Sequence, residues 1–293
     1  MMKVGIIGTG LMGKAIATRL LSTGYKLIAY NRTPSKAEPL RKLGAQIADS
    51  PKKVAENSDL VIIIVKDHKA VESISFGKDG IVHGKHKNLI VADMSTINPI
   101  SSQKIASRFQ KYDIPRIDTP IMGGPNLAEK GDLVIMMGGR KSIYKKCKPV
   151  FDIIGKRTFH LGNNGAGNAM KLAMNLQIAI LALAISEGIL LAKKSGLNPL
   201  KFLEVLNSTY FKTGMSILKG PKMAKGNFKP SFFLSMMKKD LGEINYTAKK
   251  FGANLPTTRL ANQIYQNALT NGYGNLDYTG ILAFLEKMSR YKH

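Results

Sequence analysis

Short apolar runs alternate with amphipathic stretches along about the first 160 residues of the chain. An amphipathic pattern over 14–23 predicts a helix directly after the first apolar run. When strands and helices alternate, crossover connections place the strands parallel, so we expect a largely parallel sheet flanked by helices, a doubly wound α/β fold. The runs that predict its strands are 2–7, 26–30, 60–65, 89–92, 114–117, 133–137 and 157–160.

Strand patterns stop after residue 162, and helical patterns continue to the end of the chain. A long helix is predicted from about Gly165 through the apolar run 176–192, and it joins the two parts directly. A chain of 293 residues is about two ordinary domains long, so we expect an α/β domain over 1–162 and an all-helical domain over 163–293. Further helices are predicted over 199–206, 236–250 and 256–269.

The run 176–192 resembles a membrane span in its apolar composition. It carries Gln177, Ser186 and Glu187, and it falls short of the roughly 20 apolar residues that a span needs. We therefore expect a core helix and no membrane association.

A lysine and an asparagine stand at the start of this long helix. Lys171 and Asn175 are four residues apart, so their side chains share one face. Because the helix continues as a nearly unbroken apolar run, we expect it to be buried and both side chains to project into a cleft. Desolvation disfavours the ammonium form of a lysine and lets it exchange a proton near neutral pH. Lys171 is therefore a candidate general acid/base; the alternative is a stem packed on the helix with its amine in water.

A glycine-rich turn follows the first predicted strand and precedes the first predicted helix. Strand, G-x-G-x-x-G and helix in this order form the dinucleotide-binding arrangement of a Rossmann-type domain. The glycines permit a tight turn and a close approach to a pyrophosphate, whose charge the helix N-terminus stabilises. A glycine turn without a ligand is the alternative. The candidate cofactor contacts here are Gly8, Thr9, Gly10, Leu11, Met12 and Gly13.

The second predicted strand ends in Asn31, Arg32 and Thr33, where an enzyme that selects NAD usually carries a carboxylate for the ribose hydroxyls. No carboxylate stands at these positions. The planar fork of Arg32 suits a 2′-phosphate, with Asn31 and Thr33 adding neutral hydrogen bonds, so we expect NADP (NADPH), with NAD the less favoured cofactor. A solvated surface arginine is the alternative.

The chain is strongly basic, with 44 Lys plus Arg against 19 Asp plus Glu and a formal net charge of +25. This charge attracts polyanions at low salt, but the lysines are spread along the chain without an aromatic-interleaved basic motif, so nucleic acid is not the expected partner. His83 and His86 lack cysteine or carboxylate neighbours, and we expect no metal site. A single cysteine, Cys147, and an N-terminus unlike a signal peptide favour a reducing, cytoplasmic location.

Five motifs in order resemble those of the β-hydroxyacid dehydrogenase family, whose best-known member is 3-hydroxyisobutyrate dehydrogenase, and the resemblance extends over essentially the whole chain. The first is the glycine loop described above, with Met12 at the family's methionine position. The others are Ser95-Thr96-Ile97-Asn98-Pro99 (cofactor loop), Asp118-Thr119-Pro120-Ile121-Met122-Gly123-Gly124 (substrate loop), Gly165-x-Gly167-x-x-x-Lys171-x-x-x-Asn175 (catalytic helix) and Lys239-Asp240-Leu241.

The resemblance implies roles for residues outside the glycine loop. Val65, Lys66, Thr96 and Lys239 are expected to contact the cofactor. Met122, Gly123, Gly124, Lys171 and Asn175 are expected to contact the substrate, Lys171 and Asn175 as the catalytic residues. The family usually has serine at the position of Met122, and that hydroxyl helps to hold the substrate carboxylate. A methionine does not replace this bond strongly, although the amides of Gly123 and Gly124 form a concave donor site for an anion.

We therefore expect an NADP-dependent oxidoreductase that transfers a hydride reversibly between nicotinamide and a small hydroxy acid, semialdehyde or keto acid, with Lys171 as general acid/base. An imine reductase on the same fold is the first alternative, but those enzymes tend to replace the lysine. A nucleotide-sensing or nucleic-acid-associated module is the second alternative. The apolar C-terminal helices favour a homodimer or homotetramer.

Overall fold

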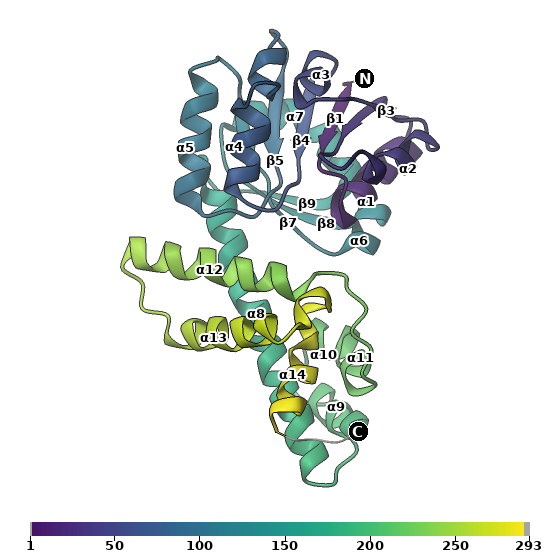
Figure 1. Ribbon diagram of the computed structural model, residues 1–293, viewed down its shortest axis with the longest axis vertical. Helices are drawn as coiled ribbons and strands as arrows, with labels where there is room; N and C mark the ends of the chain where they lie inside the picture. Colours follow the sequence, from purple (N-terminus) through teal and green to yellow (C-terminus); the bar gives the residue numbers. More distant parts are fainter. Residues whose placement is uncertain (1, 290–293) are drawn as a thin grey trace. The chain divides into compact units, whose positions relative to one another are not determined.

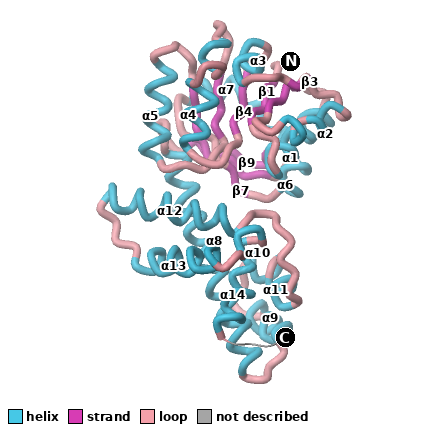
Figure 2. The backbone as a smooth tube through the Cα atoms, viewed as in Figure 1, coloured by secondary structure: helices cyan, strands magenta, loops and turns pink. Residues whose placement is uncertain are grey.

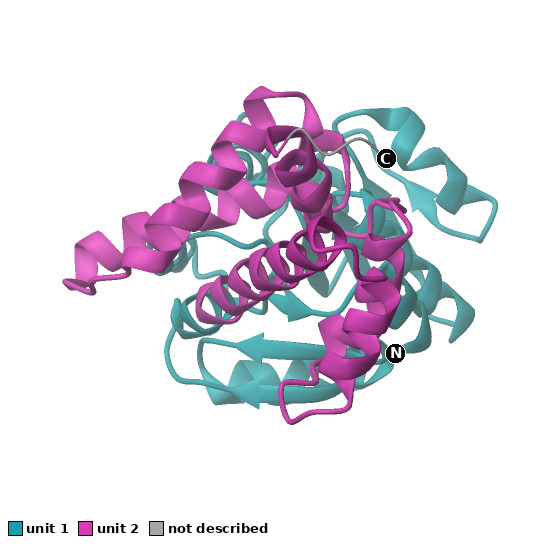
Figure 3. Ribbon diagram, turned by 90° about the horizontal axis from the view of Figure 1, so that it is seen from below, with its two compact units in different colours: residues 1–171 teal, residues 172–293 magenta. Residues whose placement is uncertain are grey.

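The computed structural model describes residues 2–289. The chain forms two compact units, residues 1–171 and 172–293, which are coloured separately in Figure 3. Helix α8 (Ala166–Lys194) contributes to both, because the division falls at the end of its second turn. The boundary expected between residues 162 and 163 falls in the loop before this helix, and a domain boundary there stays a prediction.

Six parallel strands form the central sheet of the first unit, in the order β3-β2-β1-β4-β5-β6 (Figures 1 and 2). The chain leaves β1 toward β2 on one side, and β4 lies on the other side of β1. Sheets of this kind bind ligands at the carboxyl ends of the strands beside such a switch point. The prediction of a doubly wound Rossmann-type sheet is confirmed. Its strands are β1 (Val4–Ile7), β2 (Leu27–Tyr30), β3 (Gln46–Ile47), β4 (Leu60–Ile63), β5 (Ile90–Asp93) and β6 (Arg116–Asp118).

A second, three-stranded sheet has the order β7-β8-β9. Its strands are β7 (Ile121–Met122), β8 (Leu133–Met137) and β9 (Gly155–His160), so the runs 133–137 and 157–160 lie outside the central parallel sheet. β7 and β8 pair antiparallel, whereas β8 and β9 pair parallel. The connection from β7 to β8 is too short for a parallel crossover, which usually takes about a dozen residues or more. The sequence did not predict β7, because two residues carry no periodic pattern.

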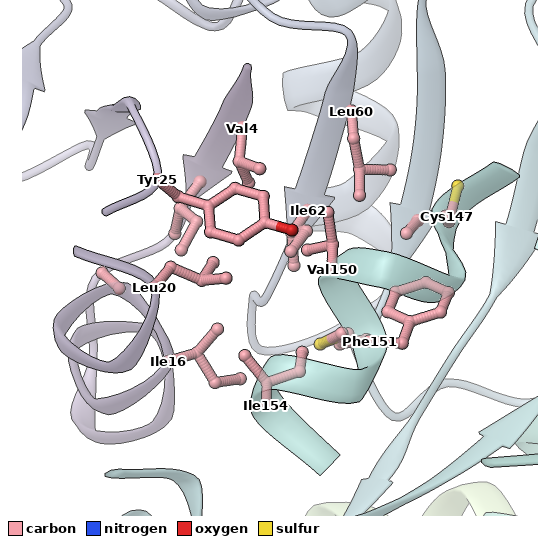
Figure 4. Close-up of a cluster of buried hydrophobic side chains, with 14 of the residues drawn as sticks. Val4, Ile16, Leu20, Tyr25, Leu60, Ile62, Cys147, Val150, Phe151 and Ile154 are labelled. Atoms are coloured by element: carbon pink, nitrogen blue, oxygen red, sulfur yellow. The ribbon is translucent and has the colours of Figure 1, made fainter. Parts of the chain in front are cut away.

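The central sheet is buried on both faces. Val4 and Ile6 pack with Phe151 in a cluster under α1 and α7 (Figure 4). The next residue, Ile7, packs with Ile63 in a second cluster formed with α3, α4 and α5. Neighbouring residues of a strand face opposite sides, so a sheet covered on both sides requires the unbroken apolar runs seen in the sequence. The helices of this unit are α1 (Leu11–Ser22), α2 (Glu38–Arg41), α3 (Pro51–Glu56), α4 (His68–Phe76), α5 (Pro99–Gln110), α6 (Pro125–Lys130) and α7 (Lys141–Ile154).

The second unit is helical, as expected, and among its described residues β pairing is limited to one isolated bridge between Phe233 and Asp277. Residues of α8, α12, α13 and α14 enclose a hydrophobic cluster around Tyr265, which is fully buried. The hydroxyl of Tyr265 donates to the carbonyl oxygen of Tyr278, so its polar end is satisfied. The helices are α9 (Pro199–Asn207), α10 (Gly214–Leu218), α11 (Gly220–Ala224), α12 (Leu234–Phe251), α13 (Pro256–Thr270) and α14 (Ile281–Met288).

Helix α8 is long and apolar enough to cross a membrane by length and composition alone. It supplies Ala179 and Ala182 to the cluster around Tyr265, and Ile189 to a second cluster of the same unit, as expected of a core helix. The expectation that the whole helix is buried is wrong, because Leu191 is 69% exposed among the described residues.

The buried carboxylate of Asp277 links several segments of the second unit by hydrogen bonds. Its carboxylate accepts hydrogen bonds from Lys219 Nζ at 2.8 Å and from the backbone N–H of Ser231 at 2.9 Å, and its other oxygen accepts from the Thr279 hydroxyl at 2.8 Å. Burial by itself raises the pKa of this carboxyl group, but Lys219 and the N–H and hydroxyl donors outweigh burial. The pKa of Asp277 therefore lies below its ordinary value.

We expect Lys219→Met to reduce the free energy of unfolding near pH 7 by about 2–4 kcal/mol, since it leaves a buried carboxylate without its cation. A carboxyl pKa that is lower in the folded state stabilises the fold above its unfolded value of about 3.9. That contribution is lost as the pH falls through the folded pKa, so the variant and the wild type should converge in acid. Urea unfolding across this pH range measures the difference, with the exposed Lys222→Met as control. Equal stabilities of the Lys219 variant and wild type at neutral pH would contradict the assignment.

Candidate active site

Three glycines after β1 shape a loop with room for a pyrophosphate. Gly8 has a φ of +100°, and an added Cβ would lie 2.0 Å from the carbonyl oxygen of Ile64. At Gly13 an added Cβ would lie 1.9 Å from the carbonyl oxygen of Gly8, so α1 packs tightly against the loop. At Gly10 an added Cβ would meet nothing within 4 Å. The three positions thus match the separate demands of a dinucleotide loop: a tight turn, open space for the phosphates and close helix packing.

The N-terminus of α1 supplies backbone donors to this space. No side chain caps the helix, and its first turn contains no acidic residue. The free N–H groups and the positive end of the helix dipole therefore favour an anion there. The buried hydroxyl of Thr9 has no hydrogen-bond partner among the described residues. The loop fits the pyrophosphate of a dinucleotide, and Gly8, Gly10 and Gly13 lie where the sequence predicted them.

Asn31 connects the glycine loop to the end of β2. Its Oδ1 accepts a hydrogen bond from Thr9 N at 3.0 Å, and its Nδ2 donates to the carbonyl oxygen of Thr33 at 2.9 Å. The Asn31 carboxamide, which was predicted to contact the cofactor, thus makes hydrogen bonds to the protein backbone through both its oxygen and its nitrogen. Arg32 and Thr33 are exposed beside it. Contacts of these three residues with a 2′-phosphate stay a prediction, with Arg32 the residue best placed to make one.

The ends of β4 and β5 are joined by Ser95. Its hydroxyl oxygen accepts from Val65 N at 3.0 Å, and its backbone N–H donates to Asp93 Oδ1 at 2.9 Å. Val65 and Thr96 are partly buried, and Lys66 is exposed. Because β4 pairs with β1, these residues lie at the same edge of the sheet as the glycine loop. The structure therefore brings the predicted cofactor residues of the first unit to one edge; their contact with a cofactor is untested.

Lys171 and Met122 meet within the first unit. Lys171 Nζ lies 3.8 Å from Met122 Sδ, in the range of a weak hydrogen bond to sulfur. Gly123 has a φ of +128°, so the substrate loop turns sharply directly after Met122. An added Cβ at Gly124 would meet nothing within 4 Å, which leaves space beside its backbone. The predicted proton donor and the predicted substrate loop are therefore neighbours.

Asn175 lies one turn after Lys171 on α8 and is buried. Its Nδ2 donates to Asp240 Oδ2 at 2.6 Å, and Lys239 Nζ lies 2.6 Å from Asp240 Oδ1. The Asp240 carboxylate, which the sequence analysis gave no role, thus holds both predicted site residues of the second unit. Because Asp240 is only 1% exposed, the Lys239-Asp240 pair is not a solvated face of α12. The carboxylate fixes the orientation of the Asn175 amide.

Asp118 is a second site residue to which the sequence analysis gave no role. Its fully buried carboxylate accepts hydrogen bonds from Gly165 N at 2.7 Å and from Asn168 N at 3.0 Å, at the start of α8. A carboxylate at this position satisfies free N–H groups and interacts favourably with the helix dipole. Burial raises the pKa of Asp118 above its ordinary value, although Arg116 and both N–H donors oppose this. In the sequence, the signal that could have identified Asp118 was its position directly after a predicted buried strand.

Comparison with known proteins agrees with these features. Residues 3–162 match the model of the NAD binding domain of 6-phosphogluconate dehydrogenase. Residues 165–285 match the model of the NAD-binding domain of NADP-dependent 3-hydroxyisobutyrate dehydrogenase. The 2-hydroxy-3-oxopropionate reductase of Escherichia coli (strain K12) is 32% identical over 291 residues, which cover 99% of each chain. The protein belongs to the β-hydroxyacid dehydrogenase family and is an oxidoreductase that binds a pyridine nucleotide.

Solved structures agree on the fold. The 3-hydroxyisobutyrate dehydrogenase of Salmonella typhimurium has a TM-score of 0.89 and 26% identity, with 97% of this chain and 100% of that chain covered. The imine reductase of Myxococcus stipitatus in complex with NADP+ has a TM-score of 0.66 and 19% identity, with 97% and 99% covered. At this level of identity, the imine reductase and this protein share the fold only.

Proposed function

We propose that the protein catalyses the reversible reduction of a small carboxylated aldehyde or keto acid to the hydroxy acid, with NADP(H) as cofactor. The observation that carries the proposal is the 3.8 Å contact of Lys171 Nζ with Met122, which supports Lys171 as a proton donor at the predicted substrate loop. The similarity to 2-hydroxy-3-oxopropionate reductase supports this substrate class, because the compound in that name carries a carboxylate and an aldehyde on either side of one carbon. Bound NADPH supplies the hydride, and its chemistry belongs to the cofactor.

The protein residues supply the proton and the placement. In the reductive direction the Lys171 ammonium donates a proton to the carbonyl oxygen as that oxygen becomes an alkoxide. In the oxidative direction the neutral amine takes the proton from the hydroxyl group. Asn175, held by Asp240, hydrogen-bonds the same oxygen and orients it toward Lys171. The amides of Gly123 and Gly124 bind the substrate carboxylate.

The preference for NADP over NAD is expected to be at least about tenfold in kcat/KM, equivalent to about 1.4 kcal/mol of differential binding. The reason is the exposed guanidinium of Arg32 at the end of β2, with no carboxylate among Asn31, Arg32 and Thr33. Arg32→Asp should reverse or abolish the preference, because a carboxylate repels a 2′-phosphate. Steady-state kinetics with both cofactors measure it, with Arg41→Asp as a surface-charge control. Equal use of NAD and NADP by the wild type contradicts the proposal.

A panel of substrates tests the proposed reaction. The purified protein is assayed with NADPH and NADH on semialdehydes, keto acids and cyclic imines, and in reverse on 3-hydroxyisobutyrate and other hydroxy acids. The proposal predicts turnover of carboxylated aldehydes or keto acids. Turnover of cyclic imines alone would support the imine reductase alternative, and salt-dependent nucleic-acid binding without turnover would support a non-enzymatic module.

We also propose a symmetric homodimer or homotetramer in the cytoplasm. The supporting observation is the uncovered apolar surface of the second unit, to which Leu191 contributes. Burial of such a surface between two copies is favourable in the same way as burial in a core.

A further inference from the structure

A buried polar network connects three loops that the motifs assign to the cofactor, the substrate and the catalytic helix. At its centre is Arg116, which is 5% exposed. It lies between Asp93 and Asp118, which are fully buried. Asp93 ends β5, directly before the 95–99 loop. Arg116 and Asp118 are the first and last residues of β6, and Asp118 is also the first residue of the substrate loop. No motif of the family resemblance includes Arg116.

The guanidinium of Arg116 uses its fork to hold several elements at once. Nη2 donates to Asp93 Oδ2 at 2.8 Å, and Nη1 lies 3.8 Å from Asp118 Oδ1. Nη1 also donates to Ser102 Oγ at 2.8 Å, near the start of α5. Nη1 also donates to Asn164 Oδ1 at 3.3 Å, in the loop before α8. One side chain thus bridges β5, β6, α5 and the loop that leads into the catalytic helix.

A second set of bonds extends from this centre to the loops themselves. Asp93 Oδ1 accepts from Ser95 N, which begins the cofactor loop. Asn168 Oδ1, in the first turn of α8, accepts from Ile97 N of that loop at 3.1 Å. Asp118 accepts from Gly165 and Asn168, as described above. The start of α8 is therefore tied to the cofactor loop directly through Asn168 and indirectly through the carboxylates that Arg116 holds.

Stability alone is a weak reason for such a network. Two carboxylates and one guanidinium lose their hydration here, and an apolar replacement of buried ionic groups is often as stable or more stable. What the charged groups provide is a defined arrangement, because both carboxylates and the two terminal nitrogens of Arg116 have fixed partners, whereas its Nε has none among the described residues.

We propose that Arg116 is a positioning residue that sets the distance between the 95–99 loop and the first turn of α8, and thereby the position of Lys171. The proposal rests on the proposed function of Lys171 as proton donor. Lys171 follows Gly165 by six residues on a continuous helix, so a shift at the anchored end carries over to its side chain. A misplacement of about 1 Å at a reacting group can reduce the rate by up to about a hundredfold.

The test compares Arg116→Met and Arg116→Lys with wild type. We expect Arg116→Met to lower kcat about tenfold or more while the dissociation constant of NADPH changes by less than about threefold. Arg116→Lys keeps the charge without the planar fork, so its kcat should lie between those of Arg116→Met and the wild type. If Arg116→Met does not fold, the double variant Asp93→Asn/Arg116→Met removes one buried carboxylate together with the cation.

A matched control separates positioning from loss of stability. Lys193 and Glu286 form a buried ion pair at 2.6 Å between α8 and α14, in the second unit. Lys193→Met should destabilise the protein without changing kcat. If the Arg116 variants keep wild-type kcat, or lose no more activity than the Lys193 variant at equal folded fraction, Arg116 is only structural and the proposal fails.

Amide hydrogen exchange supplies a readout independent of activity. In Arg116→Met we expect faster exchange in residues 165–171 and 95–99 together, and unchanged exchange in the second unit beyond α8. Unchanged exchange at both segments overturns the proposal. If the wild type turned over no carbonyl substrate with NADPH, the proposed function would fail, but the exchange data would still decide whether Arg116 couples the two loops.

Discussion

Replacing Lys171 by alanine is expected to lower kcat by about a hundredfold or more, with NADPH affinity changed by less than about twofold. The side chain lies 3.8 Å from Met122 of the substrate loop, whereas the glycine loop that fits the cofactor pyrophosphate follows β1. The loss should therefore appear in the proton-transfer step and leave cofactor binding intact. Steady-state kinetics together with a fluorescence titration of NADPH measure both quantities.

Lys194→Ala is the matched control for this variant, since it removes an exposed lysine from the other end of α8. Its kcat should equal that of the wild type. Comparable turnover in Lys171→Ala and wild type would leave Lys171 as a packing residue.

Replacing Met122 by serine is expected to lower KM for carboxylated substrates relative to neutral ones of similar size. A hydroxyl restores a hydrogen bond to the substrate carboxylate that the thioether makes poorly, worth about 1.5–3 kcal/mol when one partner is charged. The ratio of the two KM values should change by about ten- to a hundredfold. The contact of Met122 Sδ with Lys171 Nζ supports this expectation, because the side chain at residue 122 lies beside the proposed proton donor.

The wild-type methionine has its own expected preference. It adds apolar surface to the site, and each additional buried methylene of a substrate gains about 0.8 kcal/mol. Substrates with an apolar group beside the carbonyl should therefore gain over polar ones. Met122→Ala is the control, because it removes the sulfur without adding a hydroxyl. If Met122→Ser leaves the ratio of acidic to neutral substrates unchanged, Met122 does not contact the substrate and the pocket lies elsewhere.

The features that depend on neighbouring residues were predictable from the sequence. The glycine loop is an example. Gly8 adopts a positive φ, and Gly13 packs closely against Gly8, which is only five residues earlier in the sequence. Five of the six strands of the central sheet were equally clear, because burial on both faces demands continuous apolar runs. β3 was not predicted, because its two residues are not buried and form no such run. The N-terminal part of α8 carries Lys171 and Asn175 at a spacing that a helix places on one face.

The features that depend on distant residues were not predictable. Arg116 meets Asp93 only because β5 and β6 pair in one register, and a lone arginine in a short strand carries no such information. Asp240 accepts a hydrogen bond from Asn175, which lies 65 residues earlier in the sequence. The Asn31 carboxamide accepts from the loop amide of Thr9, which is 22 residues away in the sequence, and its contact with the cofactor stays a prediction. Partners of this kind follow from packing and not from local pattern.

The central claim is that the protein moves a hydride from NADPH to a carbonyl carbon. The most direct measurement is mass spectrometry of the products formed from a small semialdehyde acid and a cyclic imine, each incubated with the wild-type protein and NADPH deuterated at the transferring position. Deuterium should appear on the carbinol carbon of the hydroxy acid, and Lys171→Ala should slow its appearance. Deuterium found in the amine product but not in any hydroxy acid would contradict the central claim.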